Sequence, residues 1–201
     1  MNQSVFDVNG QLQSIESKIV VALERVSEAF RVLLWEEAKE HTLSPIQVQL
    51  LIFCAFHTEE KRKVGFLACE FNLTKATISD AVKTLEQKGY IKKETEAADT
   101  RSYCIHLTKN GLALAKKISG FATPVYDSVK ELTENQQQVL FGSLMELIQK
   151  LQVANIISIN RMCLSCRFYE KKSAGHYCRF LETALKNTEL RIDCNEYEIA
   201  N

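Results

Sequence analysis

Four of the seven cysteines lie within residues 163–201, and their types and spacing suit metal binding. The pattern is Cys163-x2-Cys166-x11-Cys178-x15-Cys194. A Cys-x-x-Cys pair presents two thiolates to one metal with little loop ordering, and the two later thiolates close a tetrahedral site. No secretory signal is expected at the start of the chain, so the thiols stay reduced and a metal site is favoured over a disulfide framework.

Four thiolates suit zinc, and they equally suit a four-iron iron–sulfur cluster, whose ligands also include close pairs and distant single cysteines. The segment 161–201 is small and poor in apolar residues, so it needs a metal or a partner surface to stay folded. We expect zinc, with the iron–sulfur cluster as the alternative and unconnected thiols as a third reading. His176 either replaces one thiol as a ligand or takes part in an aromatic contact beside Tyr177.

The remaining three cysteines are scattered singly along the chain. Cys54 and Cys69 are expected to pack in the core as small apolar side chains. Cys104 alternates outward from the apolar side of its predicted strand, so we expect an exposed and oxidisable thiol. No activating base is visible near it in the sequence.

Positive charge gathers in one central segment. Residues 1–60 carry 4 basic and 9 acidic side chains, whereas residues 61–117 carry 12 basic and 6 acidic ones. The whole chain balances at 25 of each sign with a pI near 6.9. An acidic scaffold with a basic middle is typical of a dimeric DNA-binding protein, although a solvated lysine-rich face gives the same count.

Within that segment, residues 75–88 have the pattern of a helix that enters the major groove of DNA. Thr74 is the expected cap and Gly89 the left-handed stop. A recognition helix needs small, polar or cationic groups at its N-terminal end, because that end must approach base edges closely. The residues expected to do so are Lys75, Ala76, Thr77, Ser79 and Lys83.

A β-hairpin is predicted directly after this helix, with strands over 90–94 and 102–107 and a polar loop over 95–101. Arg101 and Asp99 are expected at the loop tip, with Lys92 and Lys93 at the base. An arginine at such a tip can enter the narrow minor groove, and a carboxylate two residues away can hold its orientation. Two helices followed by a β-hairpin are the order of elements that is typical of a winged helix-turn-helix.

Long apolar stripes flank the central unit. Residues 11–40 read as one amphipathic helix, and a capping box at 133–136 opens another with a second stripe. The residues expected on the inner side of that second helix are Val139, Leu140, Leu144, Leu147, Ile148, Leu151, Ala154 and Ile157. Because each helix offers more apolar surface than this domain needs, we expect an obligate homodimer.

The chain resembles the MarR family of bacterial transcription regulators in three stretches. These are LSPIQVQLLIF at 43–53, LTKATISDAVKTLEQKGYIKKE at 73–94 and DTRSYCIHLTKNG at 99–111. The resemblance covers about residues 10–158. It implies a triangular homodimer whose two recognition helices and two wings meet a pseudopalindromic double-stranded operator. It further implies a small-molecule effector near the junction of the dimer helices and the DNA-binding lobe, where Trp35, His41 and His57 are candidates.

By position, Arg101 resembles the wing arginine of the family and Asp99 its supporting acid. Asp80 departs from the family pattern, since that outward site is often basic or amide-bearing. An acid there either reads a cytosine amino group or points to solvent. The resemblance does not extend to the cysteine-rich tail.

We therefore predict a mainly α fold, a winged helix-turn-helix with long terminal dimerisation helices and a small metal-binding tail. The predicted parts are an N-terminal dimerisation helix (1–42), a DNA-binding lobe (43–108), C-terminal dimerisation helices (109–160) and a cysteine-rich extension (161–201). The predicted function is a sequence-specific transcription regulator, a repressor, gated by a small ligand or by the redox or metal state of the tail. The alternative is an iron–sulfur redox-sensing or electron-transfer protein.

Other classes of protein are disfavoured. No nucleophile, base and orienting group come together in the motifs, and the four histidines are dispersed, so we do not expect an enzyme. No apolar run reaches about 18 residues, and the first ten residues lack a basic start and an apolar centre. A cytoplasmic location without a membrane partner is expected.

Overall fold

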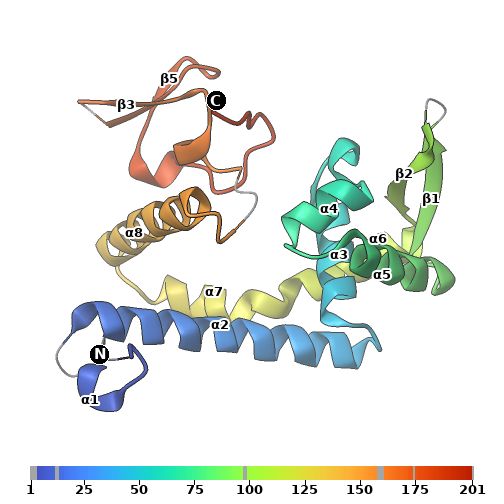
Figure 1. Cartoon of the computed structure of the whole chain (residues 1–201), viewed down its shortest axis with the longest axis horizontal. Helices are drawn as coiled ribbons and strands as arrows, with labels where there is room; N and C mark the ends of the chain where they lie inside the picture. Colours follow the sequence, from blue (N-terminus) through green and yellow to red (C-terminus); the bar gives the residue numbers. More distant parts are fainter. Residues whose placement is uncertain (1–3, 12–13, 97–98, 158–160, 174, 201) are drawn as a thin grey trace.

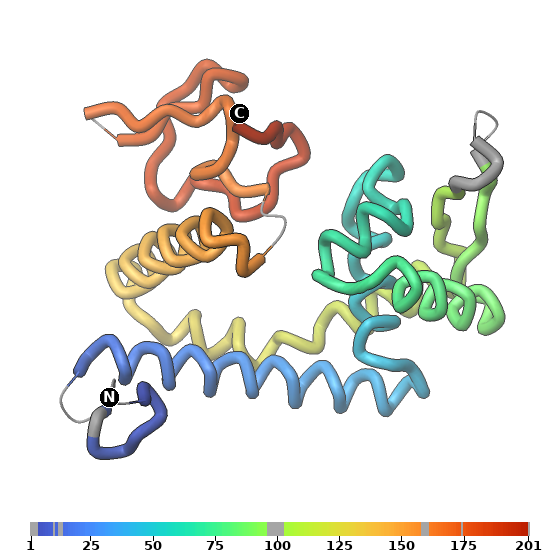
Figure 2. The backbone as a smooth tube through the Cα atoms, viewed as in Figure 1, coloured from blue at the N-terminus to red at the C-terminus, as the bar shows by residue number. Residues whose placement is uncertain are grey.

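The computed structural model describes residues 4–11, 14–96, 99–157, 161–173 and 175–200, with the backbone alone at residues 10, 96 and 99–102. A long helix runs along one edge of the molecule, and the winged lobe stands at one end of it (Figure 1). The C-terminal module, which is the cysteine-rich extension 161–201, lies toward the other end of the long helix, above a second long helix. Figure 2 shows that the chain leaves the N-terminal helix, builds the lobe and returns along that helix before it reaches the C-terminal module.

The N-terminal helices leave most of their surface uncovered. α1 (Val8–Gln11) is a single turn, and α2 (Ile15–Glu40) has 26 residues. Ser14 caps α2 by accepting a hydrogen bond from the Ser17 backbone N–H at 3.2 Å, so the helix predicted over 11–40 begins at Ile15. Of the residues that the structure describes in α2, Ala38 alone is buried.

Three helices form the centre of the lobe: α3 (Pro45–Phe56), α4 (Val64–Glu70) and α5 (Lys75–Gln87), with a 3-10 turn, η1 (Glu59–Lys61), after α3. At the predicted capping box, the Ser44 backbone N–H donates to Gln47 Oε1 at 2.9 Å. The apolar faces of the helices meet the wing and the next helix in one core. Its most buried members include Val48, Leu51, Leu67, Ile78, Leu85, Ile105 and Ile118.

The wing is an antiparallel pair, β1 (Ile91–Glu96) and β2 (Asp99–Leu107). Its pairing runs from Ile91 opposite Leu107 to Glu96 opposite Asp99, with a shift in register between residues 95 and 96. The loop predicted over 95–101 is therefore wrong in extent. The polar side chains do not end the strands at residues 95 and 101. Strand pairing is made by backbone N–H and C=O groups, which form their hydrogen bonds whatever the side chain is.

A close backbone approach holds the wing to the following helix, α6 (Lys109–Ile118). The Thr108 backbone N–H donates to the Tyr90 carbonyl at 3.0 Å. A Cβ built on Gly111 would lie 1.8 Å from that same carbonyl oxygen, so a larger residue cannot replace this glycine without moving the wing.

The helical segment that follows the wing and runs back along α2 is divided around Gly120 and Pro124, as expected. After α6 come a 3-10 turn, η2 (Ser119–Ala122), and α7 (Thr123–Lys130), which lie along α2 in Figure 1. α8 (Glu134–Val153) then begins at the predicted cap, where the Thr133 side chain accepts from the Gln136 N–H. No helix in the described part of the chain is long and apolar enough to span a membrane.

In the single chain, α8 buries only part of the predicted apolar set, together with residues that were not predicted. In the chain by itself Met145 is its buried residue, and Phe141 and Ile148 pack beside it against Met162 and Leu190 of the C-terminal module. Val139, Leu140 and Leu151, which were expected inside, are exposed. α8 therefore has two apolar faces, one covered by the module and one left open.

The C-terminal module contains a small antiparallel sheet that the sequence pattern did not predict. Its strands are β3 (Tyr169–Lys172), β4 (Gly175–Cys178) and β5 (Thr183–Leu185), with β4 in the middle. Two 3-10 turns, η3 (Cys163–Ser165) and η4 (Asn187–Glu189), flank the sheet. Strands this short give too few alternating positions for a period of two to stand out.

Candidate DNA-binding surface and cysteine pocket

The N-terminal end of α5 is open to solvent. The Thr74 side chain caps the helix by accepting from the Thr77 backbone N–H at 3.1 Å, and the two hydroxyls lie 2.9 Å apart. Ile78, Val82 and Leu85 point into the core. On the opposite side, the exposed residues are Lys75, Ala76, Thr77, Asp80 and Lys83, and Ser79 is half-buried. One short polar surface is thus presented to solvent.

A groove runs beside this surface, between α4, α5 and the wing. Lys75 and Ser79 line it from α5, Gly65 and Phe66 from α4, and Tyr103 from β2. The structure therefore brings the start of α5 and the base of the wing to the same part of the lobe.

Two lysines at the base of the wing differ in their surroundings. Lys92 is exposed. Lys93 Nζ lies 2.7 Å from Glu86 Oε2 and 5.3 Å from the centre of the Tyr103 ring. Lys93 therefore ties β1 to the end of α5. The side chains of Asp99 and Arg101 lie outside the described part of the chain, so their predicted contacts stay predictions.

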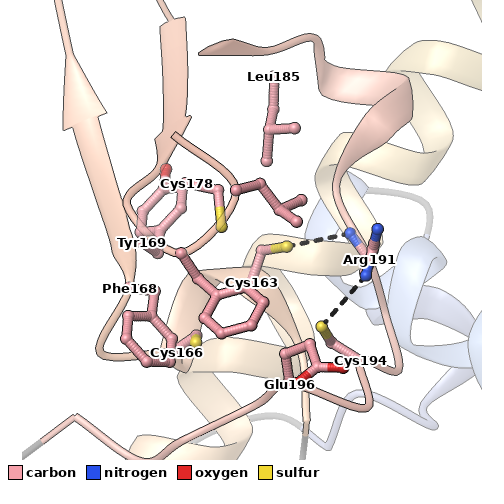
Figure 3. A pocket seen from close by; sticks show the side chains of 11 residues that line it. Cys163, Cys166, Phe168, Tyr169, Cys178, Leu185, Arg191, Cys194 and Glu196 are labelled. Carbon is pink, nitrogen blue, oxygen red and sulfur yellow. Dashed lines mark hydrogen bonds between the residues drawn. The ribbon is translucent and has the colours of Figure 1, made fainter. Parts of the chain in front are cut away.

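The four clustered cysteines line one pocket of the C-terminal module (Figure 3). Cys163 begins η3 and Cys166 directly follows it, Cys178 ends β4, and Cys194 lies in the C-terminal loop. The walls are mostly apolar, and their side chains are Phe168, Tyr169, Phe180, Leu181 and Leu185. Arg191 and Glu196 complete the lining. The structure thus gathers thiols that are spread over more than thirty residues of sequence.

Two of these thiols accept hydrogen bonds. The Arg191 backbone N–H donates to Cys163 Sγ at 3.2 Å, and the Arg191 guanidinium donates to Cys194 Sγ at 3.5 Å. Burial raises the pKa of the Cys163 thiol, although the N–H bond acts in the opposite direction. None of the four cysteines is in a disulfide.

Within the described residues, no three His, Cys, Asp or Glu side chains are grouped as the ligands of a single metal ion. His176 does not line the pocket. Its Nε2 lies 2.6 Å from Asn187 Oδ1, and its Nδ1 lies 2.7 Å from the Tyr169 hydroxyl. Since the amide oxygen can only accept, Nε2 donates to Asn187, and Nδ1 pairs with the Tyr169 hydroxyl. The predicted alternative of His176 as a ligand is therefore wrong, and its ring partner is Tyr169 rather than Tyr177.

A buried arginine joins the C-terminal module to the DNA-binding lobe. Arg161 is 7% exposed and donates to Asp193 Oδ1 at 2.7 Å and to Glu70 Oε1 at 3.2 Å. Glu70 is the last residue of α4, and Asp193 directly precedes Cys194. The guanidinium also lies over the rings of Phe53 and Phe66, at 5.6 and 5.5 Å from their centres. The Arg161 guanidinium is therefore held both by ion pairs and by cation–π contacts.

The same junction includes two further links from the module to the lobe. Asp193 Oδ2 lies 2.6 Å from His57 Nε2, and the His57 ring stacks on Phe53 with centres 3.7 Å apart. Lys61 donates to the side-chain oxygen of Asn195 at 3.1 Å. Burial alone would raise the pKa of Asp193, but hydrogen bonds from Arg161 and His57 lower it to about 2.

Sequence reasoning did not find this junction. Arg161 lies 91 positions from Glu70 and 32 from Asp193, so no local spacing connects them. The only signal in the sequence is a single arginine set directly before Met162 and Cys163. The residues have ordinary surface types, and only the folded chain shows that they meet.

The predictions made for the three cysteines outside the pocket agree with the structure to different degrees. Cys54 is buried as predicted, and its burial raises the pKa of the thiol to about 12. Cys69 is exposed, so its predicted core position is wrong: it faces outward because α4 turns Leu67 and Ala68 inward. Cys104 is partly exposed, and its thiol donates to the Glu59 carbonyl at 3.3 Å.

Comparison with known proteins agrees with this geometry. Residues 41–102 match the family model of the MarR family. The HTH-type transcriptional regulator SarZ of Staphylococcus haemolyticus is 26% identical over 110 residues, which are 55% of this chain and 73% of its own. The transcriptional repressor YetL of Bacillus subtilis is 23% identical over 152 residues, 75% of this chain and 80% of its own. The transcriptional regulator HosA of Escherichia coli is 33% identical over 82 residues, 39% of this chain and 56% of its own.

Solved structures share the fold. The crystal structure of the S. aureus MepR–DNA complex aligns with a TM-score of 0.59 at 20% identity, over 66% of this chain and 97% of that one. Streptococcus pneumoniae FabT in complex with DNA aligns with a TM-score of 0.59 at 21% identity, over 69% and 99%. The fold is therefore that of a winged-helix protein. Residues 41–102 are therefore similar to the MarR family, and the curated relatives are named as transcriptional regulators.

Proposed function

We propose that this protein binds double-stranded DNA sequence-specifically, as a homodimer on a pseudopalindromic operator. The observation that carries the proposal is the exposed polar face at the start of α5, directly before the wing. Lys75 and Lys83 can contact phosphate or a guanine edge, and the small Ala76 lets the helix approach the bases. Thr77 and Ser79 can donate or accept at either groove wall.

The wing supplies the second contact. Arg101 inserts into the minor groove with Asp99 orienting its guanidinium, and Lys92 contacts the backbone phosphates. Lys93 acts through its ion pair with Glu86, which sets the angle between the wing and α5. The bases are thereby met from the major groove while the wing grips the neighbouring minor groove.

The uncovered apolar faces of α2 and α8 support a second copy of the chain as partner. Residues from both helices line one groove: Ile19, Leu23, Val139, Leu140, Leu144 and Leu147. Ile19 and Val139 are 50% and 61% exposed. Pairing across a two-fold axis covers these exposed apolar side chains on both copies.

We propose further that the regulator is a repressor, as its relative YetL is named, and that its DNA affinity is gated. Either a small ligand or the redox or metal state of the cysteine tail sets the affinity. The Arg161 junction supports the second route, because it connects the residue beside Cys194 to the last residue of α4. A shift of the lobe changes the spacing of the two recognition helices, and both half-sites must be met together for tight binding.

Selection from a pool of random duplex DNA tests the proposal. The full chain is expected to enrich a sequence with two-fold symmetry whose half-sites lie about one helical turn apart, roughly 34 Å. Sedimentation of the complex on that sequence is expected to give two chains per duplex. Enrichment of no sequence, or one chain per duplex, would overturn the proposal.

A further inference from the structure

We infer that the contact between the C-terminal module and the winged lobe is pH-sensitive, because it requires a doubly protonated His57 ring. This histidine directly follows α3, at the place where the lobe meets the module. Loss of one ring proton weakens the contact and frees the module from the lobe. The inference goes beyond the DNA-binding proposal and does not depend on it.

Both ring nitrogens of His57 face groups that can only accept a hydrogen bond. Nδ1 lies 3.0 Å from the Phe53 carbonyl oxygen, and Nε2 lies 2.6 Å from Asp193 Oδ2. Asp193 is ionised, because its two carboxylate oxygens accept from the Arg161 guanidinium at 2.7 and 3.0 Å. A neutral imidazole has a single N–H and can satisfy only one of the two acceptors. The two hydrogen bonds together therefore require the positively charged ring.

Charged groups from the neighbouring elements surround this ring. Arg161 Nη2 lies 3.5 Å from Nε2, and Arg62, after η1, donates to the His57 carbonyl at 2.9 Å. These two cations oppose a charge on the ring, whereas Asp193 favours it. Glu70 at the end of α4 pairs with Arg161 and offsets part of its charge. The long Arg161 contact cannot replace the ring proton, because an unprotonated Nε2 at 2.6 Å would repel the Asp193 carboxylate.

The links between the module and the lobe are few and mostly polar. Among the described residues, the buried apolar side chains form two separate clusters, one in the lobe and one between α8 and the module. Across the junction, Arg161 bonds the end of α4, and Lys61 of η1 donates to Asn195 at 3.1 Å. Loss of the charge-assisted bond between His57 and Asp193 therefore removes a large share of what holds the module to the lobe.

Acid is expected to favour the docked module, and base its release. Because the docked state holds the second ring proton of His57, docking takes up a proton whenever the free ring is neutral. A histidine ring is charged in mild acid and neutral above about pH 7. Docking is therefore expected to be firm at about pH 6.5 and weaker at about pH 8.5.

The test is hydrogen–deuterium exchange of the full chain without DNA, read at the backbone amides of residues 191–195. The rates are corrected for the intrinsic effect of pH on exchange. From pH 6.5 to pH 8.5, protection of this stretch is expected to fall by about tenfold or more, as for the loss of one hydrogen bond between charged groups. Equal protection at the two pH values would overturn the inference.

Variants assign the effect to the His57 ring. Because an amide does not titrate, His57→Gln is expected to show the same protection at both pH values. Asp193→Asn provides a second variant, since its amide can donate to an unprotonated Nε2 and so removes the need for the charged ring. The matched control is His106→Gln on β2, whose two ring nitrogens each lie 3.4 Å from a carboxylate, those of Glu59 and Glu94, outside the junction.

The control is expected to keep the pH dependence of the natural chain. A tenfold fall in protection in His57→Gln or in Asp193→Asn would contradict the assignment, as would its loss in His106→Gln. Because exchange is measured without DNA, failure of DNA binding leaves this result unchanged. Equal protection at the two pH values, in turn, leaves the winged-helix proposal untouched.

Discussion

Arg161 donates to Asp193 at 2.7 Å and to Glu70 at 3.2 Å, and so ties the residue before Cys194 to the end of α4. Two carboxylates share one guanidinium that is 7% exposed. Breaking a buried pair leaves an unpaired charge behind. The contact thus couples the C-terminal module to the lobe that is proposed to bind DNA.

Replacing Arg161 is therefore expected to destabilise the protein. Because Asp193 is partly exposed, we expect Arg161→Gln to lower the free energy of unfolding by about 1–3 kcal/mol. Chemical denaturation measures the change. The matched control is Arg167→Gln, whose ion pair with Glu198 has both side chains more than half exposed and is expected to contribute about 0–1 kcal/mol. Equal losses in the two variants would contradict the special role of the junction.

The junction also makes a specific prediction about acid. The folded-state pKa of Asp193 is about 2, below its ordinary value of 3.8. A depressed carboxyl pKa stabilises the fold above the ordinary value, and this stabilisation is lost as pH falls toward the folded pKa. The difference in unfolding free energy between the natural chain and Asp193→Asn is expected to be constant from pH 7 to about pH 5. It should then shrink below about pH 4, and a constant difference down to pH 3 would exclude the low pKa.

The wing and α5 make separable contributions to DNA binding. Arg101→Ala is expected to weaken operator binding by roughly 1–3 kcal/mol. Lys83→Ala is expected to remove a phosphate contact and so to reduce the slope of log affinity against log salt concentration by about one. Fluorescence anisotropy over a range of salt concentrations measures both. Lys150→Ala removes the same charge from an exposed position on α8, outside α5 and the wing, and serves as the control. Normal affinity of Arg101→Ala at physiological salt would refute the wing assignment.

The open face of α8 is expected to form the dimer. Leu140 is 41% exposed and lines the groove shared with α2, so Leu140→Glu should give a monomer by sedimentation. Leu112→Glu on α6 places the same charge at a side chain that is 39% exposed and lies outside that groove. The control is expected to stay dimeric. A dimer of Leu140→Glu with unchanged affinity would move the interface elsewhere.

Cys54 and Cys69 are expected to differ in reactivity. Burial raises the pKa of Cys54 to about 12, so its thiolate is scarce at pH 8, and its side chain is also covered. An alkylating reagent should modify the exposed Cys69 in the folded chain and Cys54 only after unfolding. Peptide mass analysis distinguishes the two sites. Rapid labelling of Cys54 in the folded protein would show that the core opens.

The fold of the DNA-binding lobe could be predicted because the sequence signals for its helices are local. The cap at Thr74, the stop at Gly89 and the 3.6-residue period of Ile78, Val82 and Leu85 all lie within one helix. The division of the return helices at Pro124 follows from the same kind of signal.

The C-terminal module and its docking were not predictable in the same way. Short strands give little periodicity, and the buried contacts of Arg161 join residues far apart in sequence. The spacing of the cysteines indicated one site, but it could not tell an ion from a cluster, because the separation of the sulfurs is set by the fold. On the covered face of α8, Ile148 was predicted but Phe141 and Met145 were not, because the stronger apolar stripe of this helix is the one that the single chain leaves open.

The proposed DNA recognition depends on contacts between the start of α5 and base edges. Its most direct test is the ratio of affinities for the selected operator and for scrambled DNA, measured for the natural chain and for Thr77→Ala combined with Ser79→Ala. We expect the ratio to fall by about ten- to a hundredfold in the double variant while its affinity for scrambled DNA stays the same. An unchanged ratio would contradict it.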